Sequence, residues 1–295
     1  MKKIIVIGSI NVDNVMYTSN MPVPGMTVYG DSFLSNVGGK GANQACAIHF
    51  LNNEVDFYGA IGKDNNGKMV QNFLKEAGLT ANLKVCDKVC TGVASILIDK
   101  KNAENQIVCV PGANVEITQE DIDKIDFKKY GILLLQLENP ANVMTYAMKK
   151  AKEAGLLVIL NPAPYQAIPT SCYRYIDFFI PNEHELELYT NDMESGNSAM
   201  RAKHLVNAGL KNVIVTLGNN GSLYVSKERM IKVDAYNVEA VDTTGAGDSY
   251  CGAFVVALNE GKVIEDAMMF ANKASSITVT RKGAISSLPK RSEIE

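Results

Sequence analysis

The second half of the chain alternates short apolar segments with segments that carry helix start and stop signals. Residues 131–137, 156–160 and 213–217 are apolar almost throughout, and Pro140 and Gly155 mark the start and the end of one intervening helix. Strands that are apolar along their whole length are typical of a parallel sheet covered on both faces. The sequence therefore predicts an α/β fold, with three α/β/α layers around a mostly parallel central sheet.

Two other parts of the chain do not fit this sheet. Residues 27–35 alternate only in part between apolar and polar side chains, and a turn-rich stretch at 100–105 separates two further strand-like runs, which predicts a hairpin. We expect these strands to form a small separate sheet, a lid contributed by about 12–36 and 91–111. No repeat or linker interrupts the chain, so residues 1–295 are interpreted as one domain.

Composition excludes several classes of protein. The chain has 29 Lys and Arg against 32 Asp and Glu, a net charge of −3, so nothing indicates a nucleic acid or a membrane surface as a partner. No apolar run is long enough to span a bilayer. The six cysteines and three histidines match no metal-binding spacing. With no secretion signal, the expected location is the cytoplasm, with the thiols reduced.

Polar residues recur where the predicted strands end. Asn11 and Asp13 follow the first strand, at 3–9, and project to the same side because they alternate on an extended segment. They could hydrogen-bond one polyol, or they could be ordinary turn-forming loop residues. Because the carboxyl ends of parallel strands meet at one edge of a sheet, that edge is the predicted ligand site. Later strands end with Glu138, Asn161, Asn182, Glu185 and Thr216.

The strongest local signal is at 242–248, which reads DTTGAGD. We expect a strand before it, at 235–241, and a helix after it, over the apolar run at 250–258. Its small residues leave backbone N–H groups accessible at a helix start, where a phosphate binds well. A carboxylate at Asp248 would repel that anion, unless Asp248 is a base for a hydroxyl that attacks a phosphoryl group. The alternative is that Asp248 is the N-cap of the helix.

A second glycine-rich segment, at 38–43, reads GGKGAN and precedes a helix predicted to end near Leu51. It is not a Walker loop, because neither Ser nor Thr follows its lysine. Glycines at a helix start let a ligand approach the backbone, and Lys40 and Asn43 could then hold hydroxyl groups. The alternative is a flexible turn with a helix cap.

The order of these motifs resembles that of the ribokinase-like sugar kinases, also called the phosphofructokinase B family. The resemblance covers nearly the whole chain, and the motifs are most similar to those of ribose-phosphorylating members. It implies a ribokinase-like fold and ATP-dependent phosphorylation of the 5-hydroxyl of D-ribose, giving D-ribose 5-phosphate and ADP. It also implies Mg²⁺ and an activating monovalent cation, K⁺. The other motifs that carry it lie at 8–13, 136–138, 161–164, 181–183 and 280–284.

Residue roles follow from the same resemblance. Asp248 would be the general base, beside an anion hole formed by Gly245, Ala246 and Gly247. The residues expected to bind the sugar, besides Asp248, are Asn11, Asp13, Gly39, Lys40, Gly41, Asn43 and Glu138. Those expected to contact the nucleotide are Asn182, Thr216, Leu217, Gly218, Asn219, Asn220, Gly221, Gly247 and Asn272. Glu185 matches a Mg²⁺ motif that acts through water, and the monovalent-cation site matches Asp242, Thr244, Thr278, Arg281, Gly283 and Ser287. At Thr244, Thr278, Arg281 and Gly283 the ligand would be a main-chain carbonyl.

Other functions remain open on the same scaffold. The substrate could be 2-deoxyribose, fructose, tagatose 6-phosphate or a nucleoside, although Asn11 and Asp13 favour a sugar with vicinal hydroxyls. A phosphorylated substrate would need a basic cluster, and only Lys40 is evident. A non-catalytic sugar sensor would be free to lose Asp248, which is present. The partly apolar lid strands predict a homodimer formed through the lid.

Overall fold

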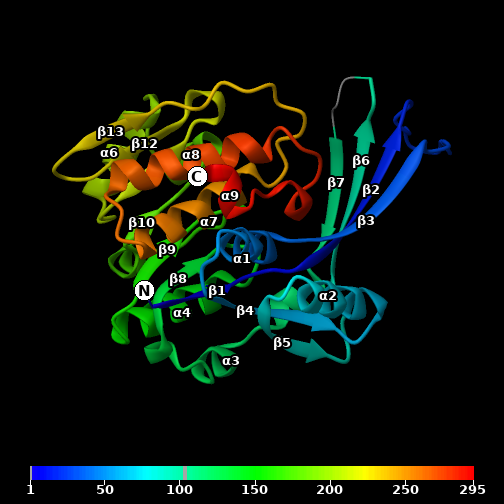
Figure 1. Cartoon of the computed structure of the whole chain (residues 1–295), viewed down its shortest axis with the longest axis horizontal. Helices are drawn as coiled ribbons and strands as arrows, with labels where there is room; N and C mark the ends of the chain where they lie inside the picture. The colour runs from blue at the N-terminus through cyan, green and yellow to red at the C-terminus, as the bar shows by residue number, and fades with distance from the viewer. Residues whose placement is uncertain (1, 102–104) are drawn as a thin grey trace.

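The computed structural model describes residues 2–101 and 105–295. A nine-stranded sheet forms the main body, and a four-stranded sheet projects beside it (Figure 1). In spatial order the large sheet consists of β13 (Met230–Val233), β12 (Ser222–Val225), β11 (Val213–Thr216), β10 (Phe178–Phe179), β9 (Leu157–Leu160), β8 (Tyr130–Leu135), β1 (Lys3–Ile7), β4 (Val55–Gly62) and β5 (Thr80–Cys86). The small sheet consists of β3 (Ser32–Gly38), β2 (Asn11–Thr18), β6 (Gly92–Asp99) and β7 (Asn105–Val110).

The large sheet is parallel except at one end, where β12 and β13 are antiparallel. The position of β1 inside the sheet explains why its sequence is a continuous apolar run. Its side chains alternate between two hydrophobic cores, Ile4 and Val6 in one and Ile5 and Ile7 in the other, and all four are fully buried. The predicted three-layer α/β/α arrangement is therefore confirmed.

Helices cover both faces of this sheet. The core of Ile4 and Val6 is completed by α1 (Lys40–Phe50), α2 (Asn65–Glu76), α7 (Ala246–Asn259), α8 (Ile264–Thr278) and α9 (Arg291–Ile294). The core of Ile5 and Ile7 is completed by α3 (Gln119–Asp123), α4 (Ala141–Glu153), α5 (Glu183–Tyr189) and α6 (Ser198–Asn207). Short 3-10 turns are η1 (Gly112–Glu116), η2 (Phe127–Lys129), η3 (Thr170–Tyr175), η4 (Gly218–Asn220) and η5 (Ile285–Ser287). Within the described residues, no helix has the length and apolar character that a membrane span requires.

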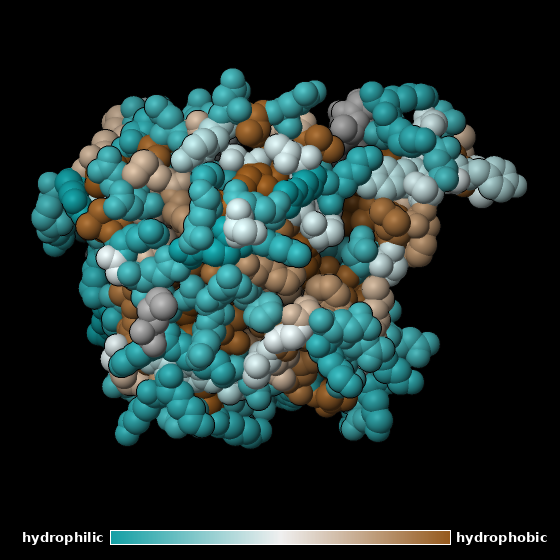
Figure 2. All heavy atoms as spheres, in the orientation of Figure 1, coloured by the Kyte–Doolittle hydropathy of each residue, from teal (hydrophilic) through white to brown (hydrophobic). Residues whose placement is uncertain are grey.

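The small sheet is built around β2, which pairs in parallel with β6 and antiparallel with β3. The hairpin predicted near its far edge is confirmed, because β6 and β7 pair antiparallel; its predicted turn falls partly on 102–104, which lie outside the described residues. The strand predicted at 27–35 is wrong in its bounds. Pairing with β2 begins at Ser32 and continues to Gly38, so β3 reaches the glycine-rich segment itself. Hydrophobic side chains are visible on this sheet in the space-filling view (Figure 2).

The strand predicted at 235–241 is absent. This segment is irregular and mostly exposed, and only its end is tied down, where the N–H groups of Val241 and Asp242 donate to the carbonyl of Val279. The reason is positional: Val233 pairs with Ser222, the first residue of β12, so the residues after Val233 run past the end of their partner strand.

The helix predicted over 250–258 begins earlier, at Ala246, and its N-cap is Gly245, with φ of 76°. A left-handed conformation of this kind favours glycine. Asp248 therefore lies inside the first turn of α7, and the alternative interpretation of Asp248 as the N-cap is wrong.

Two features mark the edge of the large sheet beyond β4. The helix α2 starts at Asn65, where the Asp64 carboxylate accepts the Gly67 N–H at 2.7 Å and caps it. The strand β5 was not predicted, since its side chains alternate irregularly between half-buried and exposed positions. An edge strand of this kind carries no clear apolar pattern.

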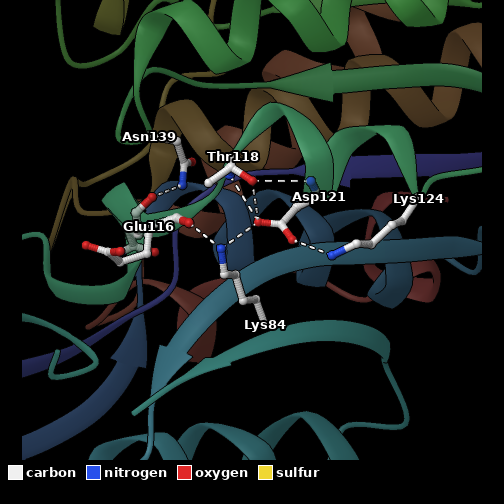
Figure 3. Close-up of polar contacts among 7 residues, drawn as sticks. Lys84, Glu116, Thr118, Asp121, Lys124 and Asn139 are labelled. Carbon is white, nitrogen blue, oxygen red and sulfur yellow. Dashed lines mark hydrogen bonds and ion pairs between the residues drawn. The ribbon is translucent and has the colours of Figure 1, made fainter. Parts of the chain in front are cut away.

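A lysine of β5 fixes the segment that leads back from the small sheet. The Lys84 ammonium donates to the Glu116 carbonyl at 2.5 Å and to the Asp121 carboxylate at 2.6 Å (Figure 3). Asp121 also forms a capping box with Thr118 at the start of α3. These contacts hold η1 and α3 against the sheet edge, close to the beginning of β2.

Candidate active site

Asp248 is the centre of the site. Its side chain is only 6% exposed, and each carboxylate oxygen accepts a hydrogen bond from α1. Asn43 Nδ2 donates to Oδ2 at 2.8 Å, and Gln44 Nε2 donates to Oδ1 at 2.9 Å. The two glycine-rich segments of the sequence are therefore brought into direct contact, because α1 and α7 pack side by side on one face of the large sheet.

The turn before α7 forms one wall of the site. α7 has no side-chain cap, so main-chain N–H groups of its first turn remain available for an anion. The Ala246 N–H donates to the Thr243 carbonyl at 3.2 Å, which turns it away from a ligand. A Cβ added to Gly247 would meet no atom within 4 Å, so Gly247 borders open space. Of the three predicted anion-hole residues, Gly247 has the clearest access.

Asn11 and Asp13 lie at the start of β2, where the small sheet joins the main body. Asn114 in η1 holds this segment: its Nδ2 donates to Asn11 Oδ1 at 2.8 Å and to the Ile10 carbonyl, and its Oδ1 accepts the Ile10 N–H. Asp13 is paired in register with the end of β3, and a Cβ on Gly38 would lie 2.0 Å from Asp13 Oδ2. The two side chains predicted to bind a polyol are thus placed by contacts with distant segments.

The segment 38–43 lies directly against the end of β1. A Cβ on Gly39 would lie 2.9 Å from the Asn11 main-chain nitrogen, and one on Gly41 would lie 2.6 Å from the Gly8 carbonyl carbon. Glycine is needed at both positions for this approach. Glu138, after β8, accepts the Lys40 main-chain N–H at 3.1 Å and the Ser9 hydroxyl. Glu138 therefore anchors the glycine-rich turn.

Charge accumulates around Lys40. Burial opposes the charge on its ammonium, but the carboxylates of Asp248, Glu138 and Glu185 together raise the pKa of Lys40. Burial, with the charges of Glu138 and Asp248, raises the pKa of Asp13 to about 6. Acidic groups thus surround one lysine. Such a site favours a neutral, hydroxylated ligand next to the acids, with negative charge accommodated only near Lys40 and the start of α7.

A cleft connects these groups to the ends of the later strands and has a volume of about 190 Å³. Asp248, Lys40 and Gly247 meet Asn182 and Glu185 there. The cleft is smaller than a typical pocket for a whole ligand, which is roughly 300–1,000 Å³, so it has room for only part of one. Its lining is completed by Asn161, Ala163, Ile180, Thr216, Thr243, Gly245 and Cys251.

Asn182 and Glu185 have a structural role in addition to lining the cleft. They form a capping box at α5, in which Asn182 Oδ1 accepts the Glu185 N–H at 2.7 Å and Glu185 Oε2 accepts the Asn182 N–H at 2.9 Å. Burial raises the pKa of Glu185, opposed by the Asn182 N–H and the charge of Lys40. Mg²⁺ keeps several waters and binds through one or two carboxylates and substrate phosphates. A single half-satisfied carboxylate beside open space fits that requirement.

The residues predicted to contact a nucleotide separate into two groups. Thr216 bridges to Asn182 and lines the cleft, and η4 continues from it as an exposed turn that carries Gly218, Asn219 and Asn220. Leu217 is buried, and its N–H donates to the Gly221 carbonyl at 2.8 Å. Asn272 is buried on α8, and its Nδ2 donates to the Val233 and Asp234 carbonyls at 3.2 Å. Asn272 thus anchors the end of β13 and does not line the cleft.

The segments predicted to bind a monovalent cation do meet in space. The Asp242 carboxylate accepts the Thr244 N–H at 2.9 Å and the Gly283 N–H at 2.8 Å, which joins the two segments. Although burial opposes it, these two hydrogen bonds lower the pKa of Asp242. An ionised carboxylate at the junction of two loops fits a monovalent cation.

The remaining residues of that set use their side chains elsewhere. Thr278 donates to the Ser249 hydroxyl at 2.8 Å, Ser287 donates to the Ala284 carbonyl at 2.7 Å, and Arg281 pairs with Glu293. Thr278 and Arg281 would therefore offer a cation their main-chain carbonyls, as the resemblance implied. Within the described residues, no group of three or more His, Cys, Asp or Glu forms a metal-binding cluster.

Sequence reasoning missed several residues that complete the site. Gln44 contacts Asp248, Asn114 holds Asn11, and Thr243 and Cys251 line the cleft. Gln44 directly follows the GGKGAN segment, and Cys251 lies one helical turn after Asp248. Helical spacing from the two motifs could have indicated these two residues. No local signal points to Asn114, which reaches Asn11 across 103 positions of sequence.

Comparison with known proteins identifies the family of the chain. The chain matches the model of the pfkB family of carbohydrate kinases over residues 1–291. A ribokinase from Haemophilus influenzae is 36% identical over 99% of this chain and 97% of its own length. A deoxyribokinase from Salmonella typhi is 38% identical over 97% of this chain and 95% of its own length. The structure of Arabidopsis thaliana ribokinase complexed with ribose and ATP has a TM-score of 0.91 and 32% identity, and the match covers 99% of this chain and 97% of that one.

The chain therefore belongs to the pfkB family of carbohydrate kinases, which confirms the resemblance found in its motifs. Within this family it is an enzyme, a sugar kinase of the ribokinase type.

Proposed function

We propose that the protein transfers the γ-phosphoryl group of ATP to the 5-hydroxyl of D-ribose, giving D-ribose 5-phosphate and ADP. The observation that carries this proposal is the buried Asp248 carboxylate, which lies in one cleft with Lys40, Gly247 and Glu185. A base for a neutral hydroxyl and a place for transferred negative charge are thereby adjacent. The Haemophilus ribokinase and the Arabidopsis ribokinase complexed with ribose and ATP support this choice of substrates.

In the proposed reaction, Asp248 accepts the proton of the 5-hydroxyl as that oxygen bonds to the γ-phosphorus. The bond between the γ-phosphorus and the bridging oxygen breaks, and ADP leaves with the electron pair. Asn11, Asp13 and Asn43 would hold the other hydroxyls, so that the 5-hydroxyl is presented to Asp248. Positioning of this kind supplies much of the rate enhancement in phosphoryl transfer. Gly39, Gly41 and Glu138 would shape the sugar site through the turn that they hold.

Charge stabilisation is assigned to the other wall of the cleft. The N–H groups of the first α7 turn, with Gly245 as its left-handed cap, would bind the transferred phosphoryl group together with Lys40. Asn182, Thr216 and the exposed η4 turn would contact the nucleotide. Glu185 would hold Mg²⁺ through water, and that ion neutralises phosphate charge when it is bound. K⁺ would bind between Asp242 and the loop carbonyls near Gly283, where it would stabilise the turn that precedes α7.

The small sheet is proposed to act as a lid, contributed by about 12–36 and 91–111 of a single 1–295 domain. It carries Asn11 and Asp13, so its closure would bring them onto the sugar and exclude water from the cleft. A second copy of the chain is the proposed partner of this sheet. Both of its outer strands expose large hydrophobic side chains, among them Phe33 at 59% and Val108 at 68% exposure, which a monomer would leave in water. The six unpaired cysteines suit the reducing cytoplasm.

The test of the base assignment is Asp248→Asn. We expect kcat to fall by about 10²-fold or more, the effect of losing a general base, while ribose affinity measured by calorimetry changes little. Asp87→Asn is the matched control, because Asp87 is an exposed acid whose ion pair is with Lys63, at 3.1 Å. Turnover by Asp248→Asn near that of the control would refute the assignment.

The second candidate substrate is 2-deoxyribose, favoured by the similarity to the Salmonella deoxyribokinase. Asn11 and Asp13 are suited to vicinal hydroxyls, and a site built for a hydroxyl rejects the analogue that lacks it, because its polar groups are left unpaired. We therefore expect kcat/KM to be higher for ribose than for 2-deoxyribose, with fructose and a nucleoside lower still. A coupled ATP-consumption assay over the four substrates decides the order, and a higher value for 2-deoxyribose would replace ribose in the proposal.

A further inference from the structure

Gln44 is the most deeply buried polar contact of Asp248. Gln44 has no exposed surface, and neither has Gln136, which directly follows β8. Gln44 Nε2 donates both to Asp248 Oδ1 at 2.9 Å and to Asn161 Oδ1 at 3.1 Å. Gln44 Oε1 accepts from Gln136 Nε2 at 2.5 Å. The three amides therefore form a connected buried network that ends on the carboxylate of the proposed base.

The direction of every hydrogen bond in this network follows from Asp248. An ionised carboxylate can only accept, so the amide nitrogen of Gln44 must face it. The oxygen of Gln44 then faces Gln136, which has to present its nitrogen. Asn161 presents its oxygen to Gln44, which leaves its nitrogen to donate to the Ile180 carbonyl at 2.8 Å. Both hydrogens of the Gln44 amide are used, and its orientation is fixed from three sides.

The surrounding fold admits this network only because glycines make room for it. A Cβ on Gly8 would lie 2.1 Å from Gln136 Oε1, and one on Gly252 would lie 2.6 Å from Ala47 Cβ and 3.1 Å from the Gln44 carbonyl. Gly252 thus lets α1 approach α7 closely enough for Gln44 to reach Asp248. Gln136 Oε1 itself has no hydrogen-bond partner among the described residues. Buried amides lower the stability of the fold unless they are fully hydrogen-bonded. An apolar side chain could fill the same space at a lower cost in folding free energy.

Gln44 and Asn43 have different relations to the substrate. Asn43 donates to the other oxygen of Asp248 and is itself a proposed sugar ligand, so its side chain would also contact the substrate. Gln44 lies behind the carboxylate, with its amide fully occupied within the protein. With one donor the carboxylate could rotate about its Cβ–Cγ bond, whereas two donors on different oxygens fix its plane.

We propose that Gln44 is a positioning residue that holds the Asp248 carboxylate in the plane required to accept the sugar proton, and that Gln136 and Asn161 lock the Gln44 amide in its donating orientation. This inference rests on the proposed role of Asp248 as the base. It predicts that Gln44 acts on the chemical step through Asp248, and not on the binding of either substrate.

The experiment is a double-mutant cycle between Gln44→Met and Asp248→Asn, with kcat, both KM values and the melting temperature measured for all four proteins. Methionine keeps the length and removes both donors. In the Asp248 background we expect Gln44→Met to lower kcat by about 10- to 100-fold, the effect of losing a hydrogen bond to a charged group, with both KM values within about threefold. In the Asp248→Asn background we expect no further loss.

The outcomes separate the possible roles. An equal loss of kcat in both backgrounds would mean that Gln44 only supports the packing of α1, and a kcat within threefold of the wild type would mean that Asn43 suffices; either overturns the inference. If Asp248→Asn alone retains normal turnover, the proposed base is wrong whatever Gln44 does.

Gln136→Met is the second variant in case Gln44→Met fails to fold. It leaves Asp248 its donors but releases the Gln44 amide, so we expect a smaller fall in kcat, about 3- to 10-fold, again absent in the Asp248→Asn background. A Gln136→Met kcat equal to the wild type would remove Gln136 from the proposal.

Discussion

Replacing Gly38 by alanine tests whether the end of β3 positions the sugar site. Gly38 has an ordinary strand conformation, so alanine imposes no backbone strain. Its Cβ, however, would lie 2.0 Å from Asp13 Oδ2 and 2.7 Å from Asp13 Cγ. Contacts between unbonded atoms do not form at that distance, so the carboxylate must move by about 1 Å or more. Asp13 is short and has few rotamers, and it cannot move this far while keeping its direction into the site.

The size of the effect follows from what Asp13 is proposed to do. A hydrogen bond to a charged group contributes roughly 1.5–3 kcal/mol, and about 1.4 kcal/mol is a factor of ten in affinity. We therefore expect Gly38→Ala to raise the ribose Kd and KM by roughly 10- to 100-fold. We expect a smaller effect on kcat, because Asp248 and the α7 turn are not touched. If Asp13 cannot move, the strain appears instead as a loss of stability of about 1–3 kcal/mol.

The assay is calorimetric titration of ribose, with steady-state kinetics and a thermal melt on the same samples. Gly30→Ala is the matched control, because a Cβ there would meet its nearest atom, the Tyr17 carbonyl oxygen, at an ordinary 3.4 Å. In an Asp13→Ala background, Gly38→Ala should weaken ribose no further. A ribose Kd within threefold of the wild type at unchanged stability would refute the placement of Asp13 as a sugar ligand.

Three other predictions follow from the same geometry. Because the pKa of Asp13 is raised to about 6, its carboxylate becomes protonated as pH falls through 6; ribose KM should therefore rise below that pH and should lose this dependence in Asp13→Asn. Asp242→Ala removes the carboxylate that joins Thr244 and Gly283, so turnover should no longer respond to K⁺ while wild-type turnover rises with it; an unchanged response would exclude Asp242 from the cation site. Val108→Asp places a charge on the exposed small sheet and should convert a dimer to a monomer in light scattering, whereas a wild-type protein of monomeric mass would contradict the proposed dimer.

The local sequence was sufficient for the main body and pointed to the segments that form the candidate site. Continuous apolar runs such as that of β1 can be satisfied only by burial on both faces, which is a property of parallel sheets in α/β folds. The GGKGAN and DTTGAGD segments were recognisable because close backbone approach requires glycine, and glycine can be read directly from the sequence. Their assignment to the phosphofructokinase B family rested on the same residues.

Other features depended on partners that are distant in sequence. Residues 235–241 have the composition of a strand but run past the end of β12, the partner strand of β13. α7 begins at Ala246 and not after Asp248, because the left-handed Gly245 ends the preceding turn. The bounds of β3 were set by pairing with β2. The strand β5 was not recognised because apolar and polar side chains alternate too irregularly along it.

The sequence by itself thus determined the α/β architecture and identified Asp248 as the central side chain of the site. It could not determine what holds that side chain, because Gln44 and Asp248 are 204 residues apart and meet only when α1 and α7 pack. The same is true of Asn114 and Asn11, which form a hydrogen bond across 103 positions of sequence. The turn that carries Asn114 is held at the sheet edge by Lys84, which donates to the Glu116 carbonyl. Hydrogen bonds between distant segments depend on which surfaces pack together, and that was decided only by the tertiary structure.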